Sequence, residues 1–222
     1  MSRQIALIGR CDNTRAKAPF GSPDWEIWGL GRDELLRSDM LFEPHVFWND
    51  PEHRERHAKA FGMDFPSYLH WLNANGVPVV VSEDAPDLKN AVVFPREAVL
   101  SLVGGSNAID PDRRNARRSC EPYLESTFAY MLAYAIHLHA EGAPVTRIGL
   151  WGIDLDSASE WAYQRPNAEY LIGFARGRGI DVYIPKEAHL TRSFWSVGRY
   201  GLKPNGDTSD MRPEKPQRKE AA

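Results

Sequence analysis

The sequence has few cysteines: only Cys11 and Cys120 occur in 222 residues. A pair so widely spaced matches no metal-ligand pattern and gives no disulfide framework, which is typical of a reducing compartment. Long hydrophobic runs are also missing, since no window approaches the ~18 consecutive apolar residues of a membrane span. The opening segment, MSRQIALIGR, reaches a strand-like run without a hydrophobic signal core. We therefore expect a cytoplasmic protein that is neither secreted nor inserted in a membrane.

A strong charge of one sign is absent as well. The chain has 27 Lys and Arg against 30 Asp and Glu, a net charge of −3. This balance does not predict a protein that coats nucleic acid. The one basic segment is polar and spans 104–122, with arginines at Arg113, Arg114, Arg117 and Arg118. We interpret it as a solvated loop, with contact to DNA phosphates as the alternative.

Apolar runs alternate with segments of helical character along the chain. Strands are expected at 4–9, 25–30, 41–48, 77–82, 91–94, 146–153 and 181–185. Helices are expected at 123–141, where apolar residues recur at helical spacing, and at 167–178, before Gly179. Strands separated by helices imply a mainly parallel sheet. We predict a three-layer, Rossmann-like α/β domain over 1–202 and a disordered tail over 203–222.

Ligands of open parallel sheets bind beyond the carboxyl ends of the strands, where the strand order reverses. The loop GRCDNT after the first strand offers Gly9 for close backbone approach, and Asp12 and Asn13 as ligand contacts or as a turn and cap. This loop is neither G-x-G-x-x-G nor a P-loop, so it indicates no dinucleotide fingerprint and no Walker chemistry. Ser126 and Thr127, at the start of the long helix, either cap it or lie beside a bound anion.

The densest polar group follows the strand expected at 146–153. Asp154 and Asp156 lie on one face if the strand continues, and two such carboxylates hold a divalent cation (Mg²⁺ or Mn²⁺), bind sugar hydroxyls or share a proton. Tyr163 and Gln164 are predicted ligand contacts, and Arg165 is a predicted partner for phosphate or carboxylate. The structural alternative is a salt-bridged loop.

Three residues are candidates for catalysis: His45, Asp154 and Glu160. An imidazole suits proton transfer near neutral pH, so His45, at the end of the third predicted strand, is one candidate base. Glu160 is the other candidate base. A structural role at the strand end is the alternative for His45.

Two segments resemble a group of small bacteriophage proteins. These proteins share a Pro-x-x-Asp/Ser-Trp-Glu-Ile-Trp-Gly segment and a Glu-Tyr-x-x-Gln-Arg-Pro segment. Here the first begins at Pro23 and continues over 24–29, and the second is 160–166, with Trp161 where Tyr is usual. This resemblance, which covers most of 4–200, implies a phage-encoded protein of the host cytoplasm.

A more distant resemblance is carried by AYMLAYAIHL and RIGLWGIDLD. They are similar to the late helix and strand of sialyltransferase-like and archaeal pterin-diphosphokinase-like proteins. The nucleotide-contacting helix start of that family matches 126–128, its acid matches Asp154, and its first loop matches 9–13, with Arg10 in place of Asn. The family's catalytic His would fall within 157–170, where this chain has no His. The resemblance implies a nucleotide pocket with altered chemistry.

These observations lead to one functional hypothesis and one alternative. We predict a nucleotide- or nucleotide-sugar-binding phage protein, a glycosyltransferase-like transferase that acts on a nucleotide or a modified DNA base. The alternative is a non-catalytic protein that sequesters a nucleotide-like ligand or binds a host factor. The sequence leaves the oligomeric state open, with a homo-oligomer among the alternatives.

Overall fold

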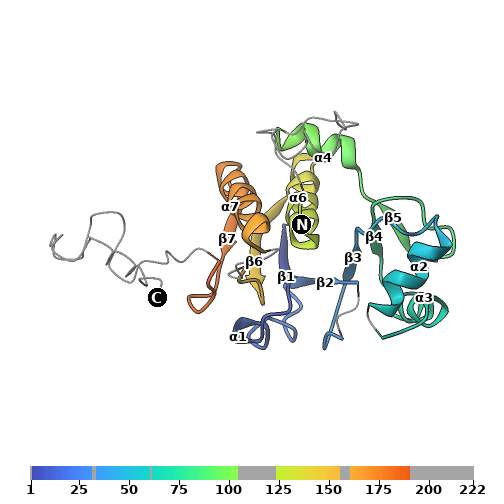
Figure 1. Ribbon diagram of the computed structural model, residues 1–222. Coiled ribbons are helices and arrows are strands. Elements are labelled where there is room, and N and C mark those ends of the chain that lie inside the picture. Colours follow the sequence, from blue (N-terminus) through green and yellow to red (C-terminus); the bar gives the residue numbers. More distant parts are fainter. Residues whose placement is uncertain (1, 32–33, 61, 105–123, 156–160, 191–222) are drawn as a thin grey trace, which may run out of the picture. The chain divides into compact units, whose positions relative to one another are not determined.

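A computed structural model describes residues 2–31, 34–60, 62–104, 124–155 and 161–190 (Figure 1). The chain divides into two units, Met1–Leu190 and Thr191–Ala222, and every described residue lies in the first. The four arginines of the basic segment, Asp156, Glu160 and the predicted tail lie outside the described residues. No described helix has the length and apolar character needed to cross a membrane.

Seven parallel strands form one sheet within the described residues, in the order β5-β4-β3-β2-β1-β6-β7. They are β1 (Arg3–Ile8), β2 (Trp25–Leu30), β3 (Met40–Glu43), β4 (Val79–Val81), β5 (Ala91–Val93), β6 (Val145–Trp151) and β7 (Asp181–Tyr183). The chain first adds strands on one side of β1 and then crosses to the other side with β6. The strand order therefore reverses between β1 and β6, and the prediction of a parallel sheet is confirmed.

Helices cover both faces of this sheet (Figure 1). They are α1 (Asp12–Arg15), α2 (Pro51–Lys59), α3 (Phe65–Ala74), α4 (Arg96–Leu102), α6 (Thr127–Ala140) and α7 (Trp161–Gly177). Because side chains alternate along a strand, Ile5 and Leu7 pack with α4, α6 and α7, whereas Ala6 and Ile8 pack on the opposite face with the segment after α1. On that opposite face, α2 and α3 cover β3 and β4. The three-layer α/β architecture is as predicted.

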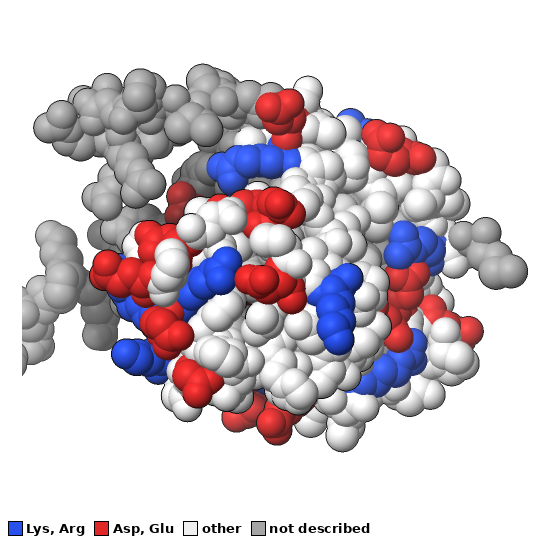
Figure 2. Space-filling model, turned by 90° about the vertical axis from the view of Figure 1, so that its right-hand side faces the viewer, with Lys and Arg blue, Asp and Glu red and all other residues white. Residues whose placement is uncertain are grey.

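Charges are mixed on the side of the sheet where α2 and α3 lie. Figure 2 shows acidic and basic side chains next to one another on this face. Two of its ion pairs join Arg56 to Glu52 at 2.7 Å and Arg54 to Asp87 at 3.2 Å. This face therefore does not carry a field of one sign that would steer a highly charged partner.

Candidate functional site

A cavity of about 430 Å³ lies at the carboxyl edge of the sheet, where the strand order reverses between β1 and β6. Its described lining comes from the ends of β1, β2, β3 and β6, the start of α6 and one residue of α7: Ile8, Gly9, Arg10, Cys11, Leu30, Gly31, Phe42, Glu43, His45, Glu125, Ser126, Thr127, Phe128, Met131, Gly152, Ile153, Asp154, Leu155 and Gln164. Small-molecule sites are typically about 300–1,000 Å³. The cavity is thus where the topology rule predicts a ligand.

The cavity brings together about half of the site residues predicted from the sequence. These are Gly9, His45, Ser126, Thr127, Asp154 and Gln164. Asp12, exposed at the start of α1, and Arg165 are not among its lining residues. Asp156 and Glu160, and the side chain of Tyr163, lie outside what the structure describes.

Gly9 brings two loops into direct backbone contact. Its N–H donates to the Trp151 carbonyl at 2.8 Å, and the Cys11 N–H donates to the Gly152 carbonyl at 2.9 Å. A Cβ atom at Gly9 would lie 2.2 Å from the Gly152 oxygen. Gly152 itself has a φ of +69°, a conformation that favours glycine. The glycine at position 9 therefore permits the β1 and β6 loops to meet and form one wall of the cavity.

Asp154 is held by donors from two distant parts of the chain. Asp154 is 6 % exposed; its Oδ2 accepts from Asn13 Nδ2 at 2.5 Å and its Oδ1 accepts from the His189 N–H at 3.1 Å. Asn13 thus contacts the predicted acid itself. Both carboxylate oxygens have protein donors. Asp154 therefore connects the loop after β6 to Asn13 in α1 and to His189, which follows β7.

The start of α6 borders the cavity. Ser126 is the N-cap, and its Oγ accepts from the Ala129 N–H at 3.1 Å. The side of the cavity formed by Ser126, Thr127 and Phe128 is therefore next to the positive end of a 14-residue helix.

Arg165 occupies a different position from the one predicted. The helix α7 begins at Trp161 and continues through Pro166, so the prediction of a helix start near 167 is wrong. Arg165 therefore lies inside α7, where its Nε contacts Glu169 Oε1 at 2.9 Å, one helical turn away. The neighbouring Gln164 is buried and lines the cavity.

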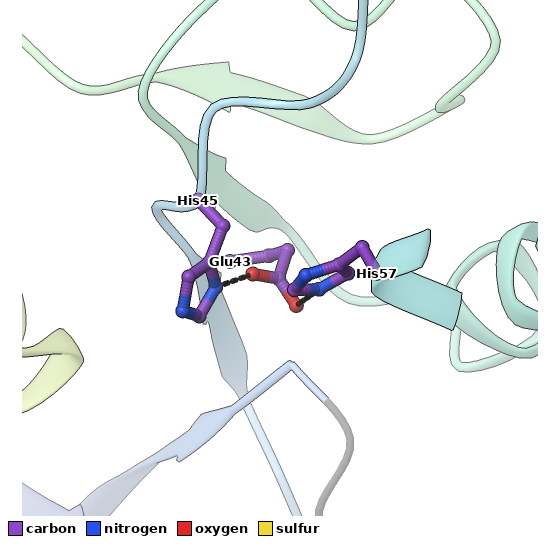
Figure 3. A group of neighbouring side chains, drawn as sticks. All are labelled: Glu43, His45 and His57. Atoms are coloured by element: carbon purple, nitrogen blue, oxygen red, sulfur yellow. Dashed lines mark hydrogen bonds and ion pairs between the residues drawn. The ribbon is translucent and has the colours of Figure 1, made fainter. Parts of the chain in front are cut away.

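Sequence reasoning missed a group centred on Glu43 (Figure 3). Glu43 ends β3 and is only 3 % exposed. Nδ1 of His45 forms a hydrogen bond with Oε1 of this carboxylate, and Nε2 of His57 lies 3.4 Å from Oε2. The Tyr68 hydroxyl donates to Oε2 and also lies 3.2 Å from the Gly31 carbonyl oxygen. Two imidazoles and a phenol therefore meet at one buried carboxylate.

Local sequence explains how these side chains come together. Pro44 has no N–H to extend the strand, so β3 ends at Glu43 and the chain turns toward α2. Asp50 caps α2 by accepting from the Glu52 and His53 N–H groups. The helix then carries His57 back to Glu43.

Two further residues shape the surroundings of this group. Phe47 stacks on the His57 ring with centroids 4.1 Å apart. A Cβ at Gly31 would lie 2.7 Å from Glu43 Oε2, so glycine at this position leaves room for the carboxylate. The orientations of Glu43 and His57 are thus fixed by packing as well as by hydrogen bonds.

The electrostatics of Glu43 are decided by its two histidines. Burial by itself raises the pKa of this carboxyl group, but the hydrogen bonds and positive charge of His45 and His57 outweigh burial and lower the pKa to about 2. Glu43 is therefore a buried anion at neutral pH. The signal in the sequence was Glu43 after three apolar strand residues, with His45 two positions later. His57 is 14 residues from Glu43, so the sequence gave no sign that it belongs to the same group.

Comparison with known proteins gives one weak similarity. No protein-family model matches the chain, and no curated protein matches it. Among solved structures, the chain is similar to the sialyltransferase CstII from Campylobacter jejuni, solved in complex with a substrate analogue, cytidine-5'-monophosphate. The identity is 12 %, the TM-score is 0.44, and the alignment covers 82 % of this chain and 79 % of that one. At these values the similarity does not indicate a function.

Proposed function

We propose that the protein binds a nucleotide or nucleotide sugar in the cavity at the sheet edge and is a transferase of the glycosyltransferase kind. One observation carries the proposal: a cavity at the reversal of strand order is bordered by a helix N-terminus on one side and by the Glu43–His45 hydrogen bond on another. Open parallel sheets bind nucleotides at this position. The first feature suits phosphate, and the second suits proton transfer to or from an acceptor.

The phosphate end of the ligand lies next to α6. The amides and hydroxyls of Ser126 and Thr127 are there, and Arg10 is the one Lys or Arg among the described lining residues. Asp154 keeps its negative charge, but both of its oxygens already accept hydrogen bonds from Asn13 and the His189 N–H, so the carboxylate does not compete for the donors that would bind a phosphate. Phe128 and Met131 offer apolar surface against which a base packs.

The reacting end of the ligand lies toward β3. In the transfer, an acceptor oxygen forms a bond to the transferred group, and the bond from that group to the nucleotide phosphate oxygen breaks. The proton of the acceptor passes to Nε2 of His45, whose Nδ1 is hydrogen-bonded to Glu43 on that side of the cavity. The positive end of α6 stabilises the negative charge that develops on the leaving phosphate.

Binding is tested by comparing nucleotides with their nucleosides. We expect CMP, UMP, AMP or GMP to raise the free energy of unfolding by about 2.7 kcal/mol at a concentration of 100 times Kd. The melting temperature should rise accordingly with these nucleotides and should not rise with the matching nucleosides. Arg10→Glu should lower nucleotide affinity at least about tenfold (~1.4 kcal/mol) in calorimetric titration. Lys89→Glu is the matched control, since Lys89 is exposed and does not line the cavity.

Transfer is tested by following nucleotide release from a panel of nucleotide sugars by phosphorus NMR. Release that depends on Arg10 supports the proposal. Equal binding of nucleotides and nucleosides, or unchanged affinity in Arg10→Glu, contradicts a phosphate site. Tight binding with no release from any nucleotide sugar contradicts the transferase and favours sequestration.

A further inference from the structure

Three metal-binding side chains converge beside the cavity. One ligand atom each from Glu43, His45 and His57 lies within 4.8 Å of the other two. Figure 3 shows both imidazoles turned toward the carboxylate between them. Glu43 and the side chain of His57 are 3 % and 14 % exposed, so two of the three groups are held inside the protein.

We propose that Glu43, His45 and His57 bind a divalent transition-metal ion, with Zn²⁺ as the best fit. Two imidazole nitrogens and one carboxylate oxygen form a donor set that catalytic zinc sites use, with a fourth position left open. Imidazole donors suit Zn²⁺ better than Mg²⁺, which prefers oxygen. The residues of this site differ from Asp154 and Asp156, for which the sequence left a divalent cation (Mg²⁺ or Mn²⁺) as one of three alternatives.

The geometry needs little change to accept the ion. Zn–N and Zn–O bonds of about 2.0–2.2 Å place the donors of a tetrahedral site about 3.4 Å apart. His57 Nε2 and Glu43 Oε2 are already separated by 3.4 Å. His45 is closer to the carboxylate and must move outward, which its position on the loop after β3 and its 55 % exposed side chain permit.

Two neighbouring side chains, Tyr68 and Phe47, hold the metal-binding residues Glu43 and His57 in place. Oε2 of Glu43 accepts from the Tyr68 hydroxyl, and Phe47 stacks on the ring of His57. Such contacts orient metal ligands and tune the ion. A dication also compensates the buried negative charge of Glu43 while both histidines stay neutral, as metal ligands must.

Two of the ligands, Glu43 and His45, line the cavity, so the open position of the ion faces it. A metal-bound water or acceptor hydroxyl has a lowered pKa and gives up its proton near neutral pH. In that arrangement His45 is a metal ligand rather than the general base that the sequence offered as a candidate. The inference does not depend on nucleotide binding, because it rests on the three side chains alone.

The test is a zinc titration of the full chain, stripped with EDTA and dialysed, in the absence of nucleotide. We expect one Zn²⁺ per chain by calorimetry and elemental analysis, and intense visible bands on Co²⁺ substitution, as four- or five-coordinate Co²⁺ gives. Loss of an outer-shell partner costs about 10–100-fold in affinity, so His45→Ala or His57→Ala should cost at least about 100-fold. His53→Ala is the control: it is on α2 as well, but its partner is Asp50.

His45→Ala separates loss of zinc binding from loss of folding. His45 is on a loop and its side chain is more than half exposed, so circular dichroism should show that the variant is folded. Equal zinc affinity of the wild type and His45→Ala would overturn the proposal, as would weak six-coordinate Co²⁺ spectra. The three side chains would then form a hydrogen-bonded cluster that holds no metal ion. The zinc titration contains no nucleotide, and the nucleotide comparison is a separate measurement, so failure of this inference and failure of the proposed function are distinguishable.

Discussion

Replacing Gly9 by alanine tests how the cavity wall is built. The new Cβ would lie 2.2 Å from the Gly152 oxygen, 2.9 Å from the Gly152 carbonyl carbon and 2.8 Å from Ile153 Cγ1. Two of these three atoms are backbone, so no side-chain rotation relieves the contact. The β1 and β6 loops must separate by about 1 Å, to the ~3.4 Å of an ordinary van der Waals contact.

The expected cost follows from what that separation breaks. Overpacking costs about 1–3 kcal/mol, and the two loop hydrogen bonds, from Gly9 to Trp151 and from Cys11 to Gly152, are worth about 1 kcal/mol each. We therefore expect Gly9→Ala to lower the free energy of unfolding by about 3–5 kcal/mol. At this chain length the melting temperature should fall by roughly 10 °C.

Urea and thermal unfolding followed by circular dichroism measure this effect. The matched control is Gly173→Ala, in the middle of α7, where a Cβ has nothing within 4 Å. Because alanine is a better helix former than glycine, Gly173→Ala should stabilise the protein by about 0.5–1 kcal/mol. The same chemical change is thus expected to have opposite signs at the two positions. A cost below about 1 kcal/mol at Gly9 would refute the close contact between the loops.

Three further predictions concern residues around the cavity. Tyr68→Phe removes a donor to the buried Glu43 carboxylate and should cost about 1.5–3 kcal/mol in urea unfolding; a cost under about 0.5 kcal/mol would contradict this hydrogen bond. Asp154→Asn should cost about 1–3 kcal/mol in thermal unfolding, because an amide cannot accept both of the hydrogen bonds that the carboxylate accepts; unchanged stability would show that those bonds contribute little. Arg165→Lys keeps a positive charge beside Glu169, one helical turn away, and Arg165 does not line the cavity, so we expect a change in the free energy of unfolding under about 0.5 kcal/mol and unchanged nucleotide affinity; a tenfold affinity loss would return Arg165 to the site.

The sheet could be predicted from sequence because its strands carry continuous apolar runs. All seven expected segments overlap a strand of the structure, since parallel strands buried on both faces, as β1 and β4 largely are, select such runs. Their ends were less predictable. The third strand was expected over 41–48 but ends at Glu43, because Pro44 stops it and the apolar residues Phe47 and Trp48 pack against α2 and α3 instead.

The start of α7 shows how tertiary packing overrides a local signal. Pro166 indicated a helix boundary, yet the buried face of α7 includes Gln164 before the proline and Asn167, Ala168 and Leu171 after it. That spacing is one continuous helical stripe against the sheet. Burial of the stripe outweighs the one hydrogen bond that Pro166 cannot make.

The Glu43 group was beyond sequence reasoning for a different reason. Its members come from β3, the loop after it, α2 and α3, and no fixed spacing links Glu43 to His57 and Tyr68. Residues 51–59 carry seven charged or histidine side chains and little apolar character, so the segment gave no periodic signal for the helix. Only the packing of α2 over β3 brings its histidine to the carboxylate.

The charges of the cavity make the two proposed ligands, the nucleotide phosphate and the metal ion at Glu43, favour each other's binding. The described lining includes three acids, Glu43, Glu125 and Asp154, against the single Arg10, which on composition alone disfavours a phosphate. Protein donors satisfy Asp154, and a dication at Glu43 would turn the β3 side of the cavity from negative to positive. Phosphate at the start of α6 and a metal ion at Glu43 then attract each other across one cavity. By linkage, each must raise the affinity of the other by the same factor.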